Sequence, residues 1–318
     1  MTTDRPWIDK YRPLLLEGIR GQETIVRTLT SFVQTETYPH LLFYGPPGCG
    51  KTTASQCMIR SLYGDSGSLA SMILNASNER GIGTVRSKIK AFAQTDTSIF
   101  QPEDKQHLCK IVVLDEFDSM TKEAQNVLRQ IMENSKYTRF ILICNDLEKI
   151  DVAIQSRCAG FRFNRLSERD TYKAVVDICQ EEDLVLSKEC RKTVSRIADG
   201  DMRSVLNVLQ QLSSLEGVMT PERICQVTGS ISLLYWERVY QILSSSASLV
   251  DRVNKAYRLT CKHSIKLGPT LWLMAEHIME EGDQERINRI LPILAEVDRA
   301  LYSQVNQRVA LITLASAF

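Results

Sequence analysis

The sequence predicts an α/β domain with a parallel sheet, followed by two all-helical parts. Apolar strand-like runs alternate with helix-like segments through Arg162-Phe163, which is typical of a parallel sheet with its ligand at the carboxyl edge of the strands. A glycine-rich loop of the kind that binds phosphates follows one of these runs. At Leu166-Ser167-Glu168-Arg169-Asp170 the pattern becomes purely helical, with a serine N-cap and an acid three residues later.

The phosphate loop matches G-x-x-x-x-G-K-[ST] in full. Leu41 to Tyr44 before it reads as a buried strand, and Thr53 to Leu62 after it reads as a helix. Glycines let backbone N–H groups turn inward around phosphates at the positive end of a helix dipole. We expect Lys51 to reach the β- and γ-phosphates and Thr52 to supply a hydroxyl to Mg²⁺. The alternative is a plain glycine turn before a helix. The predicted nucleotide-binding residues here are Gly45, Pro46, Pro47, Gly48, Cys49, Gly50, Lys51, Thr52 and Thr53.

Polar residues follow two more apolar runs. Lys110 to Leu114 ends in Asp115 and Glu116, and two acids at the end of a buried strand are costly unless they meet a cation or a reaction. Asp115 is predicted to hold Mg²⁺ and Glu116 to act as general base on the attacking water. Arg139 to Cys144 ends in Asn145, whose amide can hydrogen-bond both that water and the γ-phosphate. Ordinary turns at strand ends are the alternatives.

The amino-acid composition limits which partners and which cellular compartment we expect for this chain. The 318 residues carry a net charge of +1, so any contact with nucleic acid must be a local patch. Nine scattered cysteines without a C-x-x-C pair favour a reducing compartment and no zinc module, and the four histidines add no metal signal. The polar N-terminus lacks the apolar segment of a signal peptide, and no run reaches membrane-spanning length, so we expect no membrane partner.

Several motifs together resemble a small subunit of replication factor C, the eukaryotic and archaeal clamp loader of the AAA+ class. The resemblance is dense from Pro6 to about Leu212. Phe117 stands where the family usually has a small residue, and Asn78-Glu79-Arg80-Gly81 replaces Asp-Asp-Arg-Gly; neither change removes a catalytic group. The motifs are Trp7-Ile8-Asp9-Lys10-Tyr11-Arg12-Pro13, Gly21-Gln22, Pro39-His40-Leu41-Leu42-Phe43-Tyr44-Gly45-Pro46-Pro47-Gly48, Leu74-Asn75-Ala76-Ser77, Ser156-Arg157-Cys158 and Gly200-Asp201-Met202-Arg203.

This resemblance implies a P-loop AAA+ domain over residues 1–165, a helical lid over 166–228 and an all-α collar for oligomerisation over 229–318. It also implies an ATPase that is Mg²⁺-dependent and stimulated by DNA and the clamp. Such a subunit works in a hetero-pentamer that loads a sliding clamp on primer-template DNA of any sequence. In a eukaryotic source the protein would be nuclear.

The resemblance assigns roles to further residues. Arg157 is similar to the arginine finger, which acts in trans on the nucleotide of the neighbouring subunit. Arg203 is similar to the second sensor, which touches the γ-phosphate of its own subunit, and Asp201 before it is a plausible N-cap. The family folds its N-terminal segment over adenine, which implies contacts from Tyr11, Arg12, Pro13, Ile19, Arg20 and Gly21.

Two segments are candidates for larger partners. A helix starting near Gly83 would place Arg86 and Lys90 on one face and Val85, Ile89 and Phe92 on the core face. By resemblance Arg80, Arg86 and Lys90 would line the inside of a spiral and follow DNA phosphates; a solvated basic face is the alternative. The pair Ile99-Phe100 stands where the family inserts hydrophobic residues into the clamp, although both side chains could instead pack under a surface loop.

Two other functions are alternatives to a clamp-loader ATPase. One is a related DNA-dependent AAA+ ring ATPase of recombination or replication restart; the absence of a winged-helix pattern disfavours it. The other is a mainly structural ATP-binding subunit, which intact Glu116 and Arg157 disfavour. The apolar stripe Ile290, Leu294, Val297, Leu301 and Val305 is expected on one helix face despite Pro292. Such a stripe is more often ordinary core, but the resemblance implies that some of it faces a neighbouring subunit.

Overall fold

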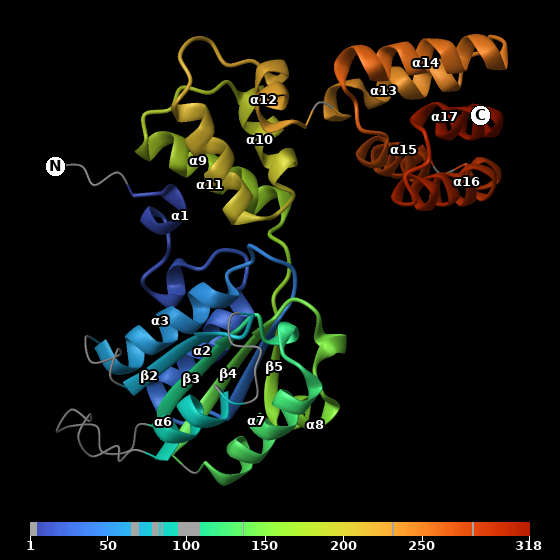
Figure 1. The fold of residues 1–318 in the computed structure, drawn as a ribbon. Coiled ribbons are helices and arrows are strands. Elements are labelled where there is room, and N and C mark those ends of the chain that lie inside the picture. The colour runs from blue at the N-terminus through green and yellow to red at the C-terminus, as the bar shows by residue number, and fades with distance from the viewer. Residues whose placement is uncertain are drawn as a thin grey trace. The chain divides into compact units, whose positions relative to one another are not determined.

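The chain divides into two compact units, and each has its own hydrophobic core. Figure 1 shows their elements. The three-part division at residues 165 and 228 stays a prediction. The first unit consists of Met1–Val185 and Val194–Leu215, and the second of Leu186–Thr193 and Glu216–Phe318. The computed structural model describes residues 5–64, 70–77, 83, 85–94, 109–135, 137–230, 232–281 and 283–318.

A five-stranded parallel sheet lies at the centre of the first unit, in the order β2-β3-β4-β1-β5. The inner strands β3, β4 and β1 are apolar and buried along most of their length, as expected for strands covered on both faces. The predicted parallel sheet is therefore confirmed. The strands are β1 (His40–Tyr44), β2 (Ser71–Asn75), β3 (Lys110–Asp115), β4 (Thr138–Cys144) and β5 (Cys158–Arg162).

The register aligns the carboxyl ends of the inner strands. Tyr44 of β1 lies opposite Cys144 of β4, and Leu114 of β3 lies opposite Leu142 of β4. Because the strands are parallel, the segments that follow β1, β3 and β4 leave the sheet at one edge. The sequence places the phosphate loop, the two acids and Asn145 in these segments.

Helices cover both faces of this sheet (Figure 1). Leu41 and Phe43 pack in one core cluster with α2 and α3, whereas Leu42 packs in another with α7 and α8. This alternation is the period of two that a strand imposes. The helical elements of this part are α1 (Trp7–Lys10), η1 (Leu16–Gly18), α2 (Glu23–Thr35), α3 (Lys51–Tyr63), the π-helical turn η3 (Val85–Ile89), α6 (Lys90–Gln94), η4 (Phe117–Ser119), α7 (Lys122–Asn134), η5 (Leu147–Lys149) and α8 (Val152–Gln155).

Four helices follow between residues 166 and 228. The predicted N-cap of the first is confirmed, because the Ser167 side chain accepts a hydrogen bond from the Asp170 N–H. Asp201 likewise caps α11, accepting from the N–H groups of Arg203 and Ser204. The helices are α9 (Glu168–Glu181), α10 (Lys188–Ala198), α11 (Met202–Ser213) and α12 (Pro221–Thr228).

The second unit is helical, as predicted, and α16 supplies much of its core. Ile290, Leu294 and Val297 are buried in that core, as is common for such a stripe, and the expectation that some of the stripe faces a neighbouring subunit stays a prediction. Val305 lies beyond the end of α16 and is 36% exposed. The helix continues through Pro292. After α12 the unit contains α13 (Ser232–Leu243), α14 (Leu249–His263), α15 (Leu267–Glu281), α16 (Gln284–Tyr302) and α17 (Gln307–Ala317).

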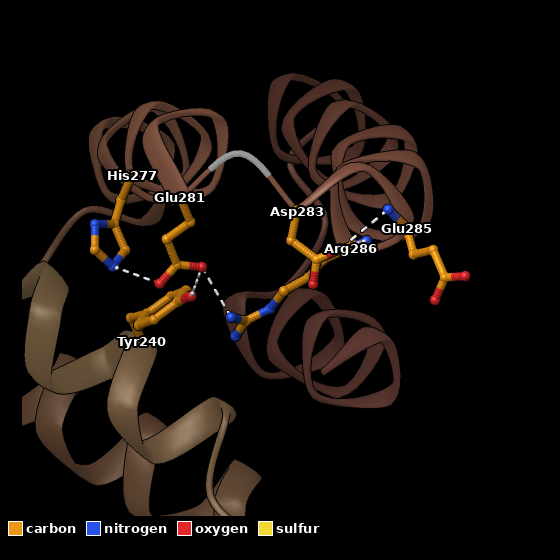
Figure 2. Close-up of polar contacts among 6 residues, drawn as sticks. All are labelled: Tyr240, His277, Glu281, Asp283, Glu285 and Arg286. Carbon is orange, nitrogen blue, oxygen red and sulfur yellow. Dashed lines mark hydrogen bonds and ion pairs between the residues drawn. The ribbon is translucent and has the colours of Figure 1, made fainter.

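Glu281 links three helices of the second unit at one end (Figure 2). Its Oε1 lies 3.2 Å from Nε2 of His277, one turn earlier on α15. Its Oε2 accepts hydrogen bonds from Nη1 of Arg286 on α16 at 2.8 Å and from the hydroxyl of Tyr240 on α13 at 3.4 Å. The Arg286 guanidinium also lies over the Tyr240 ring, 5.6 Å from its centroid. In the part of the chain described, no helix has the length and hydrophobicity of a membrane span.

Candidate nucleotide-binding site

The phosphate loop runs between β1 and α3 and depends on its glycines. Gly45, Gly48 and Gly50 have φ values of 138°, 72° and 95°, which other residues rarely adopt. A Cβ on Gly45 would lie 2.1 Å from the Phe163 carbonyl oxygen, and one on Gly48 would lie 1.6 Å from Oδ1 of Asp201. The loop therefore lies between the end of β5 and the start of α11 with no room for side chains at these two positions.

Lys51 is buried inside this loop and is 7% exposed. Its Nζ donates to the carbonyl oxygens of Gly45 at 2.6 Å and Pro46 at 2.7 Å, and to Oδ1 of Asn145 at 3.0 Å. Burial lowers the pKa of the Lys51 ammonium from its ordinary value. The lysine thus joins the phosphate loop to the end of β4, where Asn145 lies.

Thr52 and Asp115 form the candidate metal site. The Thr52 hydroxyl donates to Oδ2 of Asp115 at 2.9 Å. Within the described residues, no group of three or more His, Cys, Asp or Glu side chains is placed to hold a metal ion alone. Mg²⁺ usually takes only one or two carboxylates and obtains its other ligands from substrate phosphates and water. An adjacent hydroxyl and carboxylate at the mouth of a phosphate loop therefore fit Mg²⁺.

Glu116 has an unusual backbone conformation. Its φ is 52°, in the left-handed region, and its N–H donates to Oδ1 of Asp115 at 2.9 Å. A residue with a side chain held there costs about 1–3 kcal/mol, and such strain concentrates at functional sites. Glu116 is exposed at the carboxyl edge of the sheet, one residue beyond the metal-site carboxylate, where a general base could reach a water molecule.

Asp118 fixes the end of the neighbouring strand, a role that sequence reasoning did not assign. Its Oδ2 accepts hydrogen bonds from the backbone N–H groups of Asn145 and Asp146, both at 3.1 Å. The acidic segment after β3 therefore holds the residue that contacts Lys51. The sequence signal was present as a third acid in Asp115-Glu116-Phe117-Asp118, but its partner lies 27 residues away.

The N-terminal segment contacts α3, the phosphate loop and α9. Nη1 of Arg12 donates to Oε1 of Gln56 at 3.0 Å, and the Pro13 carbonyl oxygen accepts from the Cys57 thiol at 3.2 Å. Ile19 lies against Gly50 of the loop, with its Cγ2 3.4 Å from where a Cβ of that glycine would be. The structure thus places the predicted adenine-contacting segment beside the loop.

Ion pairs hold the same segment to α9. Arg20 pairs with Asp177 at 2.7 Å, while Lys10 and the Tyr11 hydroxyl both contact the Glu182 carboxylate. Burial, followed by the hydrogen bond to Glu182, raises the pKa of Tyr11, which keeps its hydroxyl a donor. Gly21 has a φ of 68°, and a Cβ there would lie 3.3 Å from Leu166.

The two predicted arginines lie in different surroundings. Arg157, between α8 and β5, pairs with Glu133 of α7 at 2.7 Å and donates to the Ala153 carbonyl oxygen at 2.7 Å. Arg203 is exposed on the first turn of α11, and it makes no side-chain hydrogen bond or ion pair with residues that the structure describes. The helix itself contacts the loop, since the Met202 N–H lies 3.4 Å from the Gly48 carbonyl oxygen.

The predicted partner-contacting residues are only partly described. Arg80, Ile99 and Phe100 lie outside the described residues, and for Arg86 only the backbone in η3 is described. Lys90 is exposed at the start of α6, next to fully buried Ile89, as the predicted helix faces require.

Comparisons with known proteins agree with this fold. The sequence profile of the ATPase family associated with various cellular activities matches residues 41–166. A replication factor C small subunit of Acanthamoeba polyphaga mimivirus is 41% identical over 86% of this chain and 82% of its own length. Replication factor C subunit 4 of Arabidopsis thaliana is 36% identical over 100% of this chain and 95% of its own. A small subunit of Methanococcus maripaludis is 34% identical over 98% and 97%.

Solved structures show the same fold. The RuvB Holliday junction branch migration motor of Thermotoga maritima has a TM-score of 0.54 over 80% of this chain and 86% of its own, at 12% identity. The phosphate loop, the acidic strand end and the parallel sheet define a P-loop ATPase of the AAA class. Among these ATPases, the chain belongs to the replication factor C small-subunit family, which confirms the resemblance found in its motifs.

Proposed function

We propose that this chain is an ATPase subunit of a clamp loader for DNA replication. ATP binding would open a sliding clamp and load it on primer-template DNA, and hydrolysis would release the clamp. The observation that carries the proposal is the alignment of three strand ends in a chain of this family: it joins Lys51 to Asn145, and Thr52 to Asp115. These are the groups that binding and hydrolysis of a nucleoside triphosphate require.

The chemistry follows from where each group lies. Loop N–H groups and Lys51 would hold the phosphates, because both present positive charge inside a water-poor loop. Thr52 and Asp115 would hold Mg²⁺, which neutralises phosphate charge when bound. Glu116 would take the proton of the attacking water, and Asn145 would orient that water, since it already lies 3.0 Å from Nζ of Lys51.

The segment from Tyr11 to Gly21 would enclose adenine. Its contacts with α3, the loop and α9 support this role, because they hold the segment beside the place where phosphates would lie. The residues concerned are Tyr11, Arg12, Pro13, Ile19, Arg20 and Gly21.

The two arginines would act on different nucleotides. Arg157 contacts Glu133 and Ala153, and neither belongs to the phosphate loop or to the acidic strand end, which supports a role in trans at an adjoining subunit. Arg203 would act in cis, because α11 begins against the phosphate loop through Met202 and Gly48.

We infer the partners and the cellular location of the chain from its family. Its members carry the names of subunits, so we infer a multi-subunit loader, with five subunits as the resemblance implies and a nuclear location in a eukaryotic source. Arg80, Arg86 and Lys90 would contact DNA phosphates without reading sequence, and the exposure of Lys90 beside buried Ile89 supports this. Ile99 and Phe100 would insert into the clamp.

Two substitutions distinguish a role at the chain's own nucleotide from a role at the nucleotide of the adjoining subunit. Lys51→Ala should abolish ATP binding by this chain. Arg157→Ala should leave its own ATP binding intact and slow hydrolysis at the adjoining site of the assembled loader, by as much as ~10³-fold at that site. ATP binding is measured on the single chain and hydrolysis on the complex. Loss of the chain's own ATP binding in Arg157→Ala would show that the assignment in trans is wrong.

The partner assignments have their own tests. Replacing Arg80, Arg86 and Lys90 with Ala should flatten the dependence of log Kobs on log salt by about 0.9 for each duplex phosphate that the protein no longer neutralises, equally on unrelated sequences. Replacing Ile99 and Phe100 with Ala should weaken clamp binding while ATP binding and assembly persist. An unaltered salt slope, or an unaltered clamp affinity, rejects the corresponding assignment.

A further inference from the structure

A row of basic side chains lies on α14, in the second unit and outside the candidate nucleotide site. Lys255, Arg258 and Lys262 are spaced by three and then four residues, so they project from one face of the helix. All three are exposed. From Leu249 to His263, the bounds of α14, the sequence has four Lys or Arg residues and one Asp, although the whole chain has 39 basic and 38 acidic residues. Positive charge is therefore concentrated on this helix.

The three side chains of this basic row have no anionic partner among the residues that the structure describes. Asp251, one turn before Lys255, already accepts a hydrogen bond from the Ser248 hydroxyl at 2.7 Å as part of the helix cap. Like charges three or four residues apart repel and destabilise a helix. Repulsion within the row therefore destabilises α14 in the free chain, and binding of an external anion would offset this repulsion.

A fourth cation lies at the edge of the row and is held in place. Arg308, on the first turn of α17, donates through Nη2 to Oδ1 of Asn254 at 3.1 Å. Its guanidinium lies over the Tyr257 ring, 5.5 Å from the centroid. Asn254 is one helical turn before Arg258, so Arg308 adds its charge beside the row. Because Arg308 is already oriented, it gives up little side-chain entropy when it meets an anion.

We propose that the basic row on α14, with Arg308, binds the phosphate backbone of nucleic acid. This site goes beyond the proposed function, since it lies in the helical second unit and not in the segment that contains Arg80, Arg86 and Lys90. From Lys255 to Lys262 the helix rises about 10 Å. Phosphates along one strand follow every ~3.4 Å of helix axis, so the row has the length to contact two or three in succession.

The composition of the row favours a nucleic acid over an acidic protein. Protein interfaces have an apolar, often aromatic core and are depleted of lysine. In contrast, Lys255, Arg258 and Lys262 follow one another along the helix face, and Leu259, the apolar residue between them at helical spacing, packs against the core of the second unit. Lysine and arginine without an apolar core are typical of contacts to phosphates, which position a protein without reading bases.

A matched pair of double variants tests this site. Arg258→Gln with Lys262→Gln removes two charges from the row. Arg289→Gln with Arg299→Gln removes two charges from exposed positions of α16, which also carries Glu285, Glu296 and Asp298. Both are made in full-length chain that already carries Arg80→Ala, Arg86→Ala and Lys90→Ala, so failure of the proposed DNA segment does not affect the result. Binding of random-sequence duplex DNA is measured between about 50 and 200 mM salt, a range over which the affinity that comes from phosphate contacts falls steeply.

We expect the row variant to bind DNA more weakly and to flatten the log–log salt slope by about 0.9 per phosphate, up to about 1.8, whereas the α16 variant keeps both affinity and slope. ATP binding should be the same in both variants, and circular dichroism should show the same helix content. An unchanged slope and affinity in the row variant overturns the proposal. Loss of binding to poly-L-glutamate with unchanged binding to DNA also overturns it, because the partner would then be an acidic protein.

Discussion

Asp118 positions a residue of the candidate site, although Asp118 is not itself one of the predicted site residues. Its carboxylate holds the backbone of Asn145 and Asp146, and the Asn145 amide in turn contacts Lys51. Hydrogen bonds to a charged acceptor are worth about 1.5–3 kcal/mol each. The left-handed backbone of Glu116 lies in the same turn, so Asp118 is placed to stabilise both strand ends.

We predict that Asp118→Ala slows ATP hydrolysis on the order of 10–100-fold, because a shift of about 1 Å in a positioning group has that effect. ATP affinity should change much less, since the phosphate loop and Lys51 keep their contacts with Gly45 and Pro46. Single-turnover hydrolysis and equilibrium binding measure the two separately. Asp118→Asn is the control, because its amide oxygen can still accept from the two N–H groups. Equal losses of affinity and rate in Asp118→Ala would contradict a positioning role.

Local signals and long-range contacts differ in how well the sequence predicts them. Strand ends, the phosphate loop and the caps Ser167 and Asp201 depend on neighbouring residues, and the sequence predicts each of them. It does not predict the roles of Glu133 and Glu182. Their partners, Arg157 and Lys10, are 24 and 172 residues away, and without the partner a carboxylate on a helix cannot be told from an ordinary solvated acid.

At the scale of elements, Glu182 at the end of α9 holds the N-terminal segment. It contacts both Lys10 and Tyr11, and Trp7 adds a backbone hydrogen bond to Gln210 of α11 at 3.0 Å. Burial alone would raise the pKa of Glu182, but the hydrogen bonds from Lys10 and Tyr11 outweigh it and bring this pKa below its ordinary value of 4.5. The ionised carboxylate is therefore the form that stabilises the fold.

A carboxyl whose pKa is lower in the folded state stabilises that state above its unfolded pKa, and the contribution disappears as the pH falls through the folded pKa. We therefore predict that Glu182→Gln lowers the Tm at pH 7 and that the difference from the original chain shrinks below about pH 4.5. Thermal unfolding across pH 3.5–7 measures this, with Glu189→Gln, at an exposed position of α10, as the control. A difference that is constant with pH would show that Glu182 acts through packing alone.

At the scale of the whole molecule, the Arg157–Glu133 pair bears on the proposed role of Arg157 at an adjoining subunit. The two side chains are 40% and 43% exposed, and ion pairs at such positions are worth about 0–1 kcal/mol. Breaking the pair would therefore cost little, as the proposed contact of Arg157 with a phosphate on an adjoining subunit requires. The pair keeps the guanidinium at the edge of its own chain, between α8 and β5, while that chain is alone.

We predict that Glu133→Gln raises hydrolysis at the adjoining site, up to about fivefold, because removing a pair worth about 1 kcal/mol frees Arg157 to that extent. The chain's own ATP affinity should not change. ATP affinity is measured on the single chain with Lys51 intact. Hydrolysis is measured in assembled complexes in which the chain with Glu133→Gln also carries Lys51→Ala, and every other subunit except the adjoining one carries the equivalent lysine substitution, so that only the adjoining site binds ATP. Arg157→Ala should remove the effect when combined with Glu133→Gln. A gain that persists without Arg157, or a rate that falls in Glu133→Gln alone, would show that Glu133 acts on the assembly by another route.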